Sequence, residues 1–139
     1  MSKIFINTDG GSRGNPGHAG VGVSVSNEKG EILHEECRYL GVRTNNEAEY
    51  QAVIDSLNWL LNSKISITDI TWRLDSMLVV EQLSRRWKIK EARLRELAET
   101  CWALLSQLGV KHNFMYVPRA ENARADLLAN QAMDQASEK

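Results

Sequence analysis

The sequence predicts an α/β fold: a mixed five-stranded sheet, with an antiparallel meander first and parallel strands after it, and helices on both faces. Two observations carry this prediction. Three segments of strand character follow one another with only short turns between them, which is typical of a meander. The hydrophobic period then changes to that of a helix, and later segments alternate between the two types. Because a strand–helix–strand crossover makes a parallel pair, the expected order β-β-β-α-β-α-α-β-α requires a mixed sheet.

The expected meander occupies the first forty residues. Residues 3–8 are rich in Ile and Phe and form the first strand. Valines at positions 21, 23 and 25 alternate with small residues, which predicts a half-buried strand over residues 21–27. The turn NEKG follows it, and residues 31–40 form a weaker third strand.

A helix is expected over residues 44–63, because its apolar residues recur at helical spacing. Thr44 and Glu47 form a capping-box pattern at its start. Residues 67–74 return to strand character, and residues 76–83 predict a short helix.

The last third of the chain predicts two more helices around one strand. A long helix runs over residues 91–108 and ends at Gly109. The strand HNFMYV stops at Pro118, and a final helix over residues 122–136 carries one apolar face.

Length and composition indicate one globular domain, residues 1–139, with no repeat, linker or low-complexity segment. A net charge of −1 argues against a protein that merely coats nucleic acid. No apolar run approaches a membrane span of about 20 residues, and the first residues show no signal-peptide pattern. Cys37 and Cys101 match no metal spacing and are expected to be reduced thiols. We therefore expect a monomeric, cytoplasmic protein without membrane contact.

Four acids fall at or near element boundaries and are the candidate catalytic residues. They are Asp9, Glu49, Asp75 and Asp126. Each alone has a structural explanation, as a turn residue, a helix N-cap or a partner of a helix dipole. Together they can converge at one edge of the sheet. Converging acids repel one another, and a divalent cation such as Mg²⁺ or Mn²⁺ would let them stay ionised.

Six glycines lie in or directly beside the segment DGGSRGNPGHAGVG, from Asp9 to Gly22. Two roles are open for them: a phosphate cradle, or room for a close approach to Asp9. No G-x-G-x-x-G or G-x-x-x-x-G-K-[ST] motif occurs. The second role is therefore favoured.

A basic run, RRWKIKEARLR, covers residues 85–95 with six basic residues and one Glu. It is either a solvated helix face or a patch that contacts phosphates. The candidate phosphate contacts are Arg85, Arg86, Lys88 and Lys90, with Trp87 as a packing or stacking group. Trp59, Trp72 and Trp102 are expected to pack in or against the core.

Four segments, in order and at suitable distances, resemble the ribonuclease H family, type 1. They are TDGGSRGNPGHAG, TNNEAEY, LDSMLVV and VPRAENARADLLAN, and the resemblance covers essentially the whole chain. It implies a ribonuclease H-like fold and endonucleolytic cleavage of RNA paired to DNA, leaving 5′-phosphate and 3′-hydroxyl ends. It also implies two Mg²⁺ ions, with Mn²⁺ as an alternative, and Asp9 as the residue best placed to bridge them.

By motif position the same four acids match the family's metal ligands; Glu47 does not, because the match falls on Glu49. Positions that contact nucleic acid in the family match Asn15, Thr44, Asn45 and Asn46. The carboxamides of Asn15, Asn45 and Asn46 can both donate to and accept from a ribose 2′-hydroxyl. For Asn45 and Asn46, simple helix capping is the alternative role.

The chain departs from the family in two places. The loop before the last helix, YVPRAEN, lacks the mobile His of many members, and Arg119 is its candidate substitute, with a phosphate or surface contact as the alternative. The long basic insertion of some members is absent, and residues 85–90 replace it only in part. A nuclease acting on another duplex, such as double-stranded RNA, and a hybrid-binding module that does not cut therefore stay open.

Overall fold

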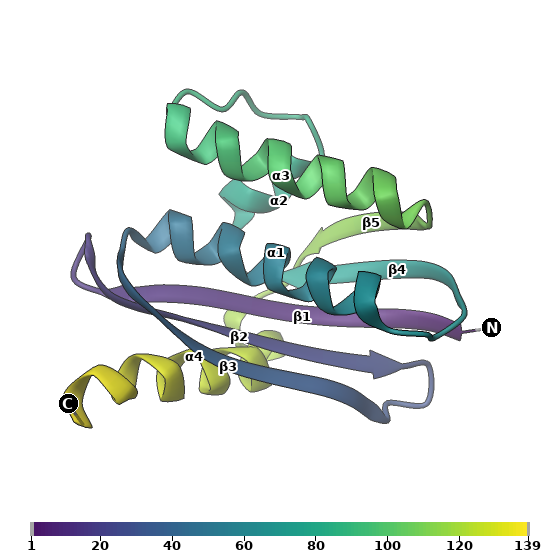
Figure 1. Cartoon of the computed structure of the whole chain (residues 1–139), viewed down its shortest axis with the longest axis horizontal. Helices are drawn as coiled ribbons and strands as arrows, with labels where there is room; N and C mark the ends of the chain where they lie inside the picture. Colours follow the sequence, from purple (N-terminus) through teal and green to yellow (C-terminus); the bar gives the residue numbers. More distant parts are fainter. Residues whose placement is uncertain (1, 139) are drawn as a thin grey trace.

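Five strands form one mixed sheet in the computed structural model, which describes residues 2–138 (Figure 1). The strands are β1 (Ser2–Arg13), β2 (Gly17–Asn27), β3 (Ile32–Arg43), β4 (Ile67–Leu74) and β5 (Lys111–Tyr116). Their order across the sheet is β3-β2-β1-β4-β5. The first three strands pair antiparallel, whereas β4 runs parallel to both β1 and β5. The predicted meander followed by parallel strands is confirmed.

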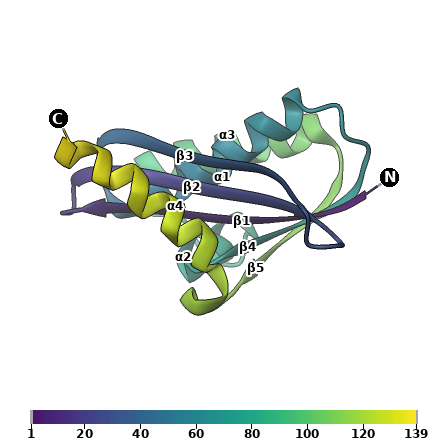
Figure 2. The same ribbon diagram turned by 90° about the horizontal axis from the view of Figure 1, so that it is seen from below.

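Helices cover both faces of this sheet, as predicted (Figures 1 and 2). On one face lie α1 (Asn45–Asn62), α2 (Met77–Leu83) and α3 (Ala92–Leu108). On the other face α4 (Ala123–Asp134) crosses β1, β2 and β3. Two short 3₁₀ helices flank α4, namely η1 (Arg119–Asn122) and η2 (Gln135–Glu138).

Local capping explains where two of the helices begin and end. At the start of α1 the Thr44 hydroxyl accepts a hydrogen bond from the Glu47 amide, and the Glu47 carboxylate accepts one from the Thr44 amide. Thr44 is therefore the N-cap, and capping by Asn45 or Asn46 is wrong because both lie inside the helix. At the end of α3, Gly109 takes the left-handed conformation with φ of 64°, as predicted.

The main core lies between the sheet and the α1–α3 layer. Trp72 is fully buried there and stacks on Phe114, with ring centroids 5.1 Å apart. Its indole N–H donates to the buried Ser56 hydroxyl of α1 over 2.9 Å, so its one polar atom is satisfied. Trp59 and Trp102 are partly buried against the same core. The packing role predicted for these three tryptophans is confirmed.

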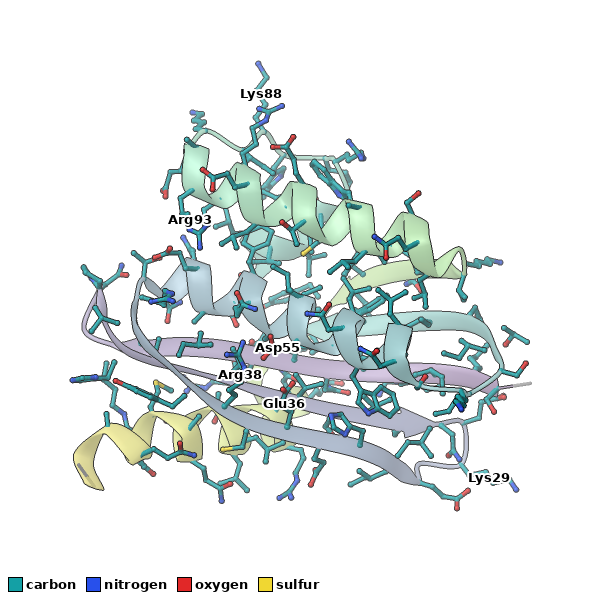
Figure 3. All side chains as sticks on the ribbon, viewed as in Figure 1. Lys29, Glu36, Arg38, Asp55, Lys88 and Arg93 are labelled. Atoms are coloured by element: carbon teal, nitrogen blue, oxygen red, sulfur yellow. The ribbon has the colours of Figure 1, made fainter. Side chains whose placement is uncertain are left out.

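Ion pairs connect the outer elements to α1 (Figure 3). Arg38 of β3 and Asp55 of α1 point toward each other and form two hydrogen bonds of 2.8 Å. Arg93 of α3 reaches the Glu47 carboxylate over 3.1 Å. The second pair holds the start of α3 beside the start of α1.

The glycine-rich segment is part of the sheet, which the sequence did not predict. β1 continues through the glycines to Arg13, so Asp9 lies inside the strand and pairs with Gly22 of β2. The expected half-burial of β2 is also wrong, since α1 packs over one face and α4 over the other. A Cβ at Gly22 would overlap the Ala125 carbonyl of α4, and this explains the small residues in β2.

Gly10 provides the same close approach on the opposite face. A Cβ at this position would overlap the Ala48 carbonyl and the Glu49 amide of α1. The structure thus confirms that these glycines allow a backbone to come close to Asp9. The backbone that approaches belongs to the protein's own helices.

Two further features concern the cysteines and the membrane. Cys37 and Cys101 are both free thiols, as expected. Within residues 2–138, no helix combines the length and the apolar character that crossing a membrane requires.

We expect Gly10→Ala to destabilise the fold strongly, because the added methyl group meets backbone atoms that cannot rotate away. The expected loss is about 3 kcal/mol or more in the free energy of unfolding, measured by urea denaturation. Gly11→Ala is the matched control, since its Cβ would lie 3.4 Å from the Met133 side chain in ordinary contact. Equal stability losses in the two variants would contradict the close-approach role of Gly10.

Candidate active site

Three carboxylates from different elements converge beside the middle of the sheet. Asp9 comes from β1, Glu49 from the second turn of α1, and Asp75 follows the last residue of β4. One carboxylate oxygen of each lies within 4.8 Å of one oxygen of each of the others. The predicted convergence of these three acids is confirmed.

The pairing of the strands explains why Asp9 and Asp75 meet. The parallel pairing of β1 with β4 ends at Thr8 and Leu74, directly before the two acids. Glu49 joins them because Gly10 lets α1 approach closely, and the Gly10 amide donates to Glu49 Oε1 over 2.6 Å. The same amide is a fixed donor that supports the charged form of Glu49.

Asp126 lines the same pocket from the other side of the sheet. The pocket has a volume of about 380 Å³ and includes all four predicted acids together with Asn45, Asn130 and Arg119 among its lining residues. Asp126 Oδ1 accepts from Arg119 over 3.0 Å and from Asn130 over 3.3 Å. The fourth acid therefore belongs to the pocket, with a cation of the protein already beside it.

Burial and mutual repulsion raise the free energy of keeping the carboxylates of this pocket ionised. Asp9 and Glu49 are 9% and 8% exposed. Burial raises the pKa of Asp9, and the neighbouring charges of Glu49 and Asp75 raise it further. Burial also raises the pKa of Glu49, again with a contribution from Asp75. Without a cation, the pocket therefore retains protons that exposed carboxyl groups would release.

These features fit a hard divalent cation. Carboxylate oxygens are the ligands that Mg²⁺ and Mn²⁺ prefer, and a dication would remove the repulsion that raises the two pKa values. Asp9, Glu49 and Asp75 could hold such an ion together. Asp126 could contact a second ion at the outer side of the pocket once Arg119 moves, because the Arg119 side chain is 74% exposed.

The predicted nucleic-acid contacts gather at the start of α1. Asn15 Oδ1 accepts from the Asn45 amide over 3.0 Å, which joins the β1–β2 turn to the helix. Thr44 uses its hydroxyl as the N-cap. Asn45 lines the acidic pocket, and Asn46 lines a neighbouring pocket of about 300 Å³ with Lys88 and Lys90. The structure thus brings these residues to one side of the acids.

Within the basic run, the two arginines at residues 85 and 86 have different surroundings from the two lysines at residues 88 and 90. Residues 85–90 lie in the loop between α2 and α3, so they do not form a helix face. The Arg85 guanidinium lies 3.8 Å from the centroid of the Trp102 ring, and Arg86 forms two hydrogen bonds with Glu81. Lys88 and Lys90 are exposed, and within residues 2–138 no ion pair involves their side chains.

None of the three histidines replaces the loop histidine that this chain lacks. Among the described residues, none of the lining residues of the acidic pocket is His. His18 contacts Tyr39 over 2.6 Å, and His34 stacks on Trp59 with ring centroids 4.6 Å apart. His112 of β5 lies 3.1 Å from the Val110 carbonyl and contacts the rings of Trp72 and Phe114 edge-on.

One buried residue of the pocket wall was not predicted from the sequence. Asn122 is 1% exposed, and its amide donates to the Thr8 carbonyl over 2.9 Å and to Asp75 Oδ1 over 3.3 Å. The available signal was its spacing, four residues before Asp126, which places the two on the same side of a helix one turn apart.

The fold and the acidic pocket define a ribonuclease H-like α/β protein, and the comparisons give its family. Residues 7–132 match the family model described as "Reverse transcriptase-like". The ribonuclease H of Ruthia magnifica is 33% identical over 153 residues, covering 99% of both chains. The chain belongs to the type 1 ribonuclease H family.

Two more relatives extend this comparison. The crystal structure of LC11-RNase H1 in complex with an RNA/DNA hybrid is 42% identical, with a TM-score of 0.90 over 96% of this chain and 98% of that one. The bifunctional protein Rv2228c of Mycobacterium tuberculosis is 44% identical over 137 residues, which is 98% of this chain. This chain spans only 37% of the length of that relative.

We expect Asp9→Asn to stabilise the protein in EDTA, and more so at higher pH. Because the pKa of Asp9 is raised, the folded protein keeps a proton that the unfolded chain releases above about pH 4. Stability therefore falls as the pH rises above that value, and the variant removes this loss. The melting temperature should rise by roughly 5 °C near pH 8 and change little near pH 4.

Asp69→Asn, which changes an acid on β4 outside the pocket, is the control for the general effect of removing a charge. A pH-independent effect of Asp9→Asn would contradict the raised pKa.

Proposed function

We propose that this chain is an endoribonuclease that hydrolyses the RNA strand of RNA/DNA hybrids with the help of divalent cations. The observation that carries the proposal is the meeting of the Asp9, Glu49 and Asp75 carboxylates within 4.8 Å. Family membership and the hybrid bound to LC11-RNase H1 support the substrate class.

The four acids would hold two Mg²⁺ ions, or Mn²⁺ in their place. The Asp9 carboxylate lies close to those of Glu49 and Asp75 and also interacts with Asp126, so Asp9 would be the acid best placed to contact both ions, with Asp126 contributing from α4. When bound, the ions would lower the pKa of a water for attack on the scissile phosphorus and offset the negative charge on the departing 3′-oxygen, so that hydrolysis would leave 5′-phosphate and 3′-hydroxyl ends. The Gly10 amide holds Glu49 in place for this step.

Selection of RNA would come from the carboxamides beside the pocket. Asn15 accepts from the Asn45 backbone, so its own amide group stays available to donate. Asn45 and Asn46 lie in the first turn of α1, where they can contact ribose 2′-hydroxyls. Thr44 would fix this turn through its cap and could contact the backbone of the nucleic acid.

Arg119 would act on Asp126 and on the charge that develops at the phosphate. Its guanidinium neutralises Asp126 in the absence of a dication, and its exposure lets it leave. We assign Arg119 to stabilising transition-state charge or to assisting product release. In many family members a loop histidine that this chain lacks is placed for such a role.

We also infer that residues 1–139 form one ribonuclease H domain. All five strands belong to one sheet, and each long helix packs against it or against α1. The longer mycobacterial relative carries this domain beside further sequence.

A cleavage assay on three duplexes tests the proposed function. We expect cutting of RNA in RNA/DNA, but not of RNA/RNA or DNA/DNA, when Mg²⁺ or Mn²⁺ is present. Asp75→Asn should lower turnover on the order of 10³-fold or more, because one ligand charge is lost. Gel analysis of end-labelled strands, with the product ends probed by ligation, gives the measurement.

The other outcomes of this assay are informative. Binding of the hybrid without cutting would show that the chain is a binding module and not an enzyme. Cutting of RNA/RNA would assign a broader substrate class.

Lys88 and Lys90 should supply salt-dependent affinity, because their charges are exposed and lie on the pocket that contains Asn46. We expect the Lys88→Gln/Lys90→Gln variant to bind hybrid more weakly. The salt dependence should also weaken, with the negative slope of log K against log salt reduced in magnitude by about 2. Fluorescence anisotropy over a range of salt measures this slope.

Lys29→Gln/Lys64→Gln is the matched control, since Lys29 lies in the β2–β3 turn far from Lys88 (Figure 3). Equal slopes for the two double variants would show that Lys88 and Lys90 are solvated and do not contact phosphates of the hybrid.

A further inference from the structure

Asn122 connects three of the elements that carry the acidic residues. It is the last residue of η1 and directly precedes α4. Its side chain donates to the Thr8 carbonyl of β1, next to Asp9, and to Asp75 Oδ1 after β4. Asp126 follows one helical turn later on α4. A single buried amide therefore meets β1, the end of β4 and the start of α4.

The orientation of this amide is fixed by a second asparagine. Asn7 Nδ2 donates to Asn122 Oδ1 over 2.9 Å. The Asn122 oxygen therefore faces Asn7, and the NH₂ group must face Thr8 and Asp75. Both hydrogens of that group find an acceptor, so the amide has one satisfied arrangement.

Helix capping does not explain these contacts. Asn122 is at the N-cap position of α4, but its side chain makes no capping hydrogen bond. Its partners are instead a strand carbonyl, a carboxylate of the acidic pocket and another amide.

We propose that Asn122 is a positioning residue for the metal ligands, an inference that rests on the proposed function. By donating to Asp75 Oδ1 it restrains the Asp75 carboxylate, whose remaining lone pairs would be available to a cation. By bonding Thr8 it holds the start of α4, and with it Asp126, against β1. Partners of this kind change metal affinity or activity by roughly 10–100-fold when they are removed.

The test measures metal binding and turnover in Asn122→Ala. Calorimetric titration of the protein with Mn²⁺ alone should show affinity at least about 10-fold weaker than in the native protein. Turnover of saturating hybrid should fall by a similar factor, with KM changed less than about twofold, because the nucleic-acid contacts are elsewhere.

Asn7→Ala gives an independent test should Asn122→Ala fail to fold. It frees the Asn122 amide to rotate, so a smaller loss of Mn²⁺ affinity is expected. In the double variant Asn7→Ala should add nothing further, because it acts only through Asn122.

Ser56→Ala is the control for loss of a buried hydrogen bond, since it removes the bond from Trp72 in the core. Native Mn²⁺ affinity in Asn122→Ala, or an equal loss in Ser56→Ala, would overturn the proposal. If the native protein binds Mn²⁺ but leaves hybrids intact, the proposed function fails, whereas the Mn²⁺ comparison still decides the role of Asn122.

Discussion

The constraint on which the rest of the structure depends is the repulsion among acids placed in one partly buried pocket. Asp9, Glu49 and Asp75 bring their oxygens within 4.8 Å, and burial and mutual charge raise the pKa values of Asp9 and Glu49. Such a cluster destabilises the fold unless a cation enters it. The surrounding packing is therefore understandable as a means of holding these groups in place at a cost in stability.

Each acid is held in place by a different contact, and each of these contacts involves the central strands of the sheet. Parallel pairing of β1 with β4 places Asp9 beside Asp75. The missing side chain at Gly10 lets α1 bring Glu49 close, and the Gly10 amide fixes its carboxylate. On the opposite face the small residues of β2 admit α4, which carries Asp126. The geometry of the acidic pocket thus depends on close contact between backbones, which explains the glycines better than a phosphate cradle does.

Much of this arrangement could be predicted from the sequence, because local patterns determine it. Hydrophobic periodicity gave the order of strands and helices, and the capping box gave the start of α1. The acids stood out because the sequence pattern placed each at or near an expected element boundary, although Asp9 in fact lies inside β1. The contacts of Arg85 with Trp102 and of Asn122 with Asp75 could not be predicted, because they join residues distant in the chain. The extension of β1 through its glycines was missed because pairing with β2, and not strand propensity, determines it.

The most direct test of the metal site is anomalous diffraction from a crystal soaked in Mn²⁺, because it locates the cation without reference to catalysis. We expect a strong peak within about 2.0–2.5 Å of oxygens from Asp9, Glu49 and Asp75, the range expected for oxygen ligands of such ions. A second peak should lie between Asp9 and Asp126. A crystal with full Mn²⁺ occupancy elsewhere, and no peak among these carboxylates, would contradict this expectation.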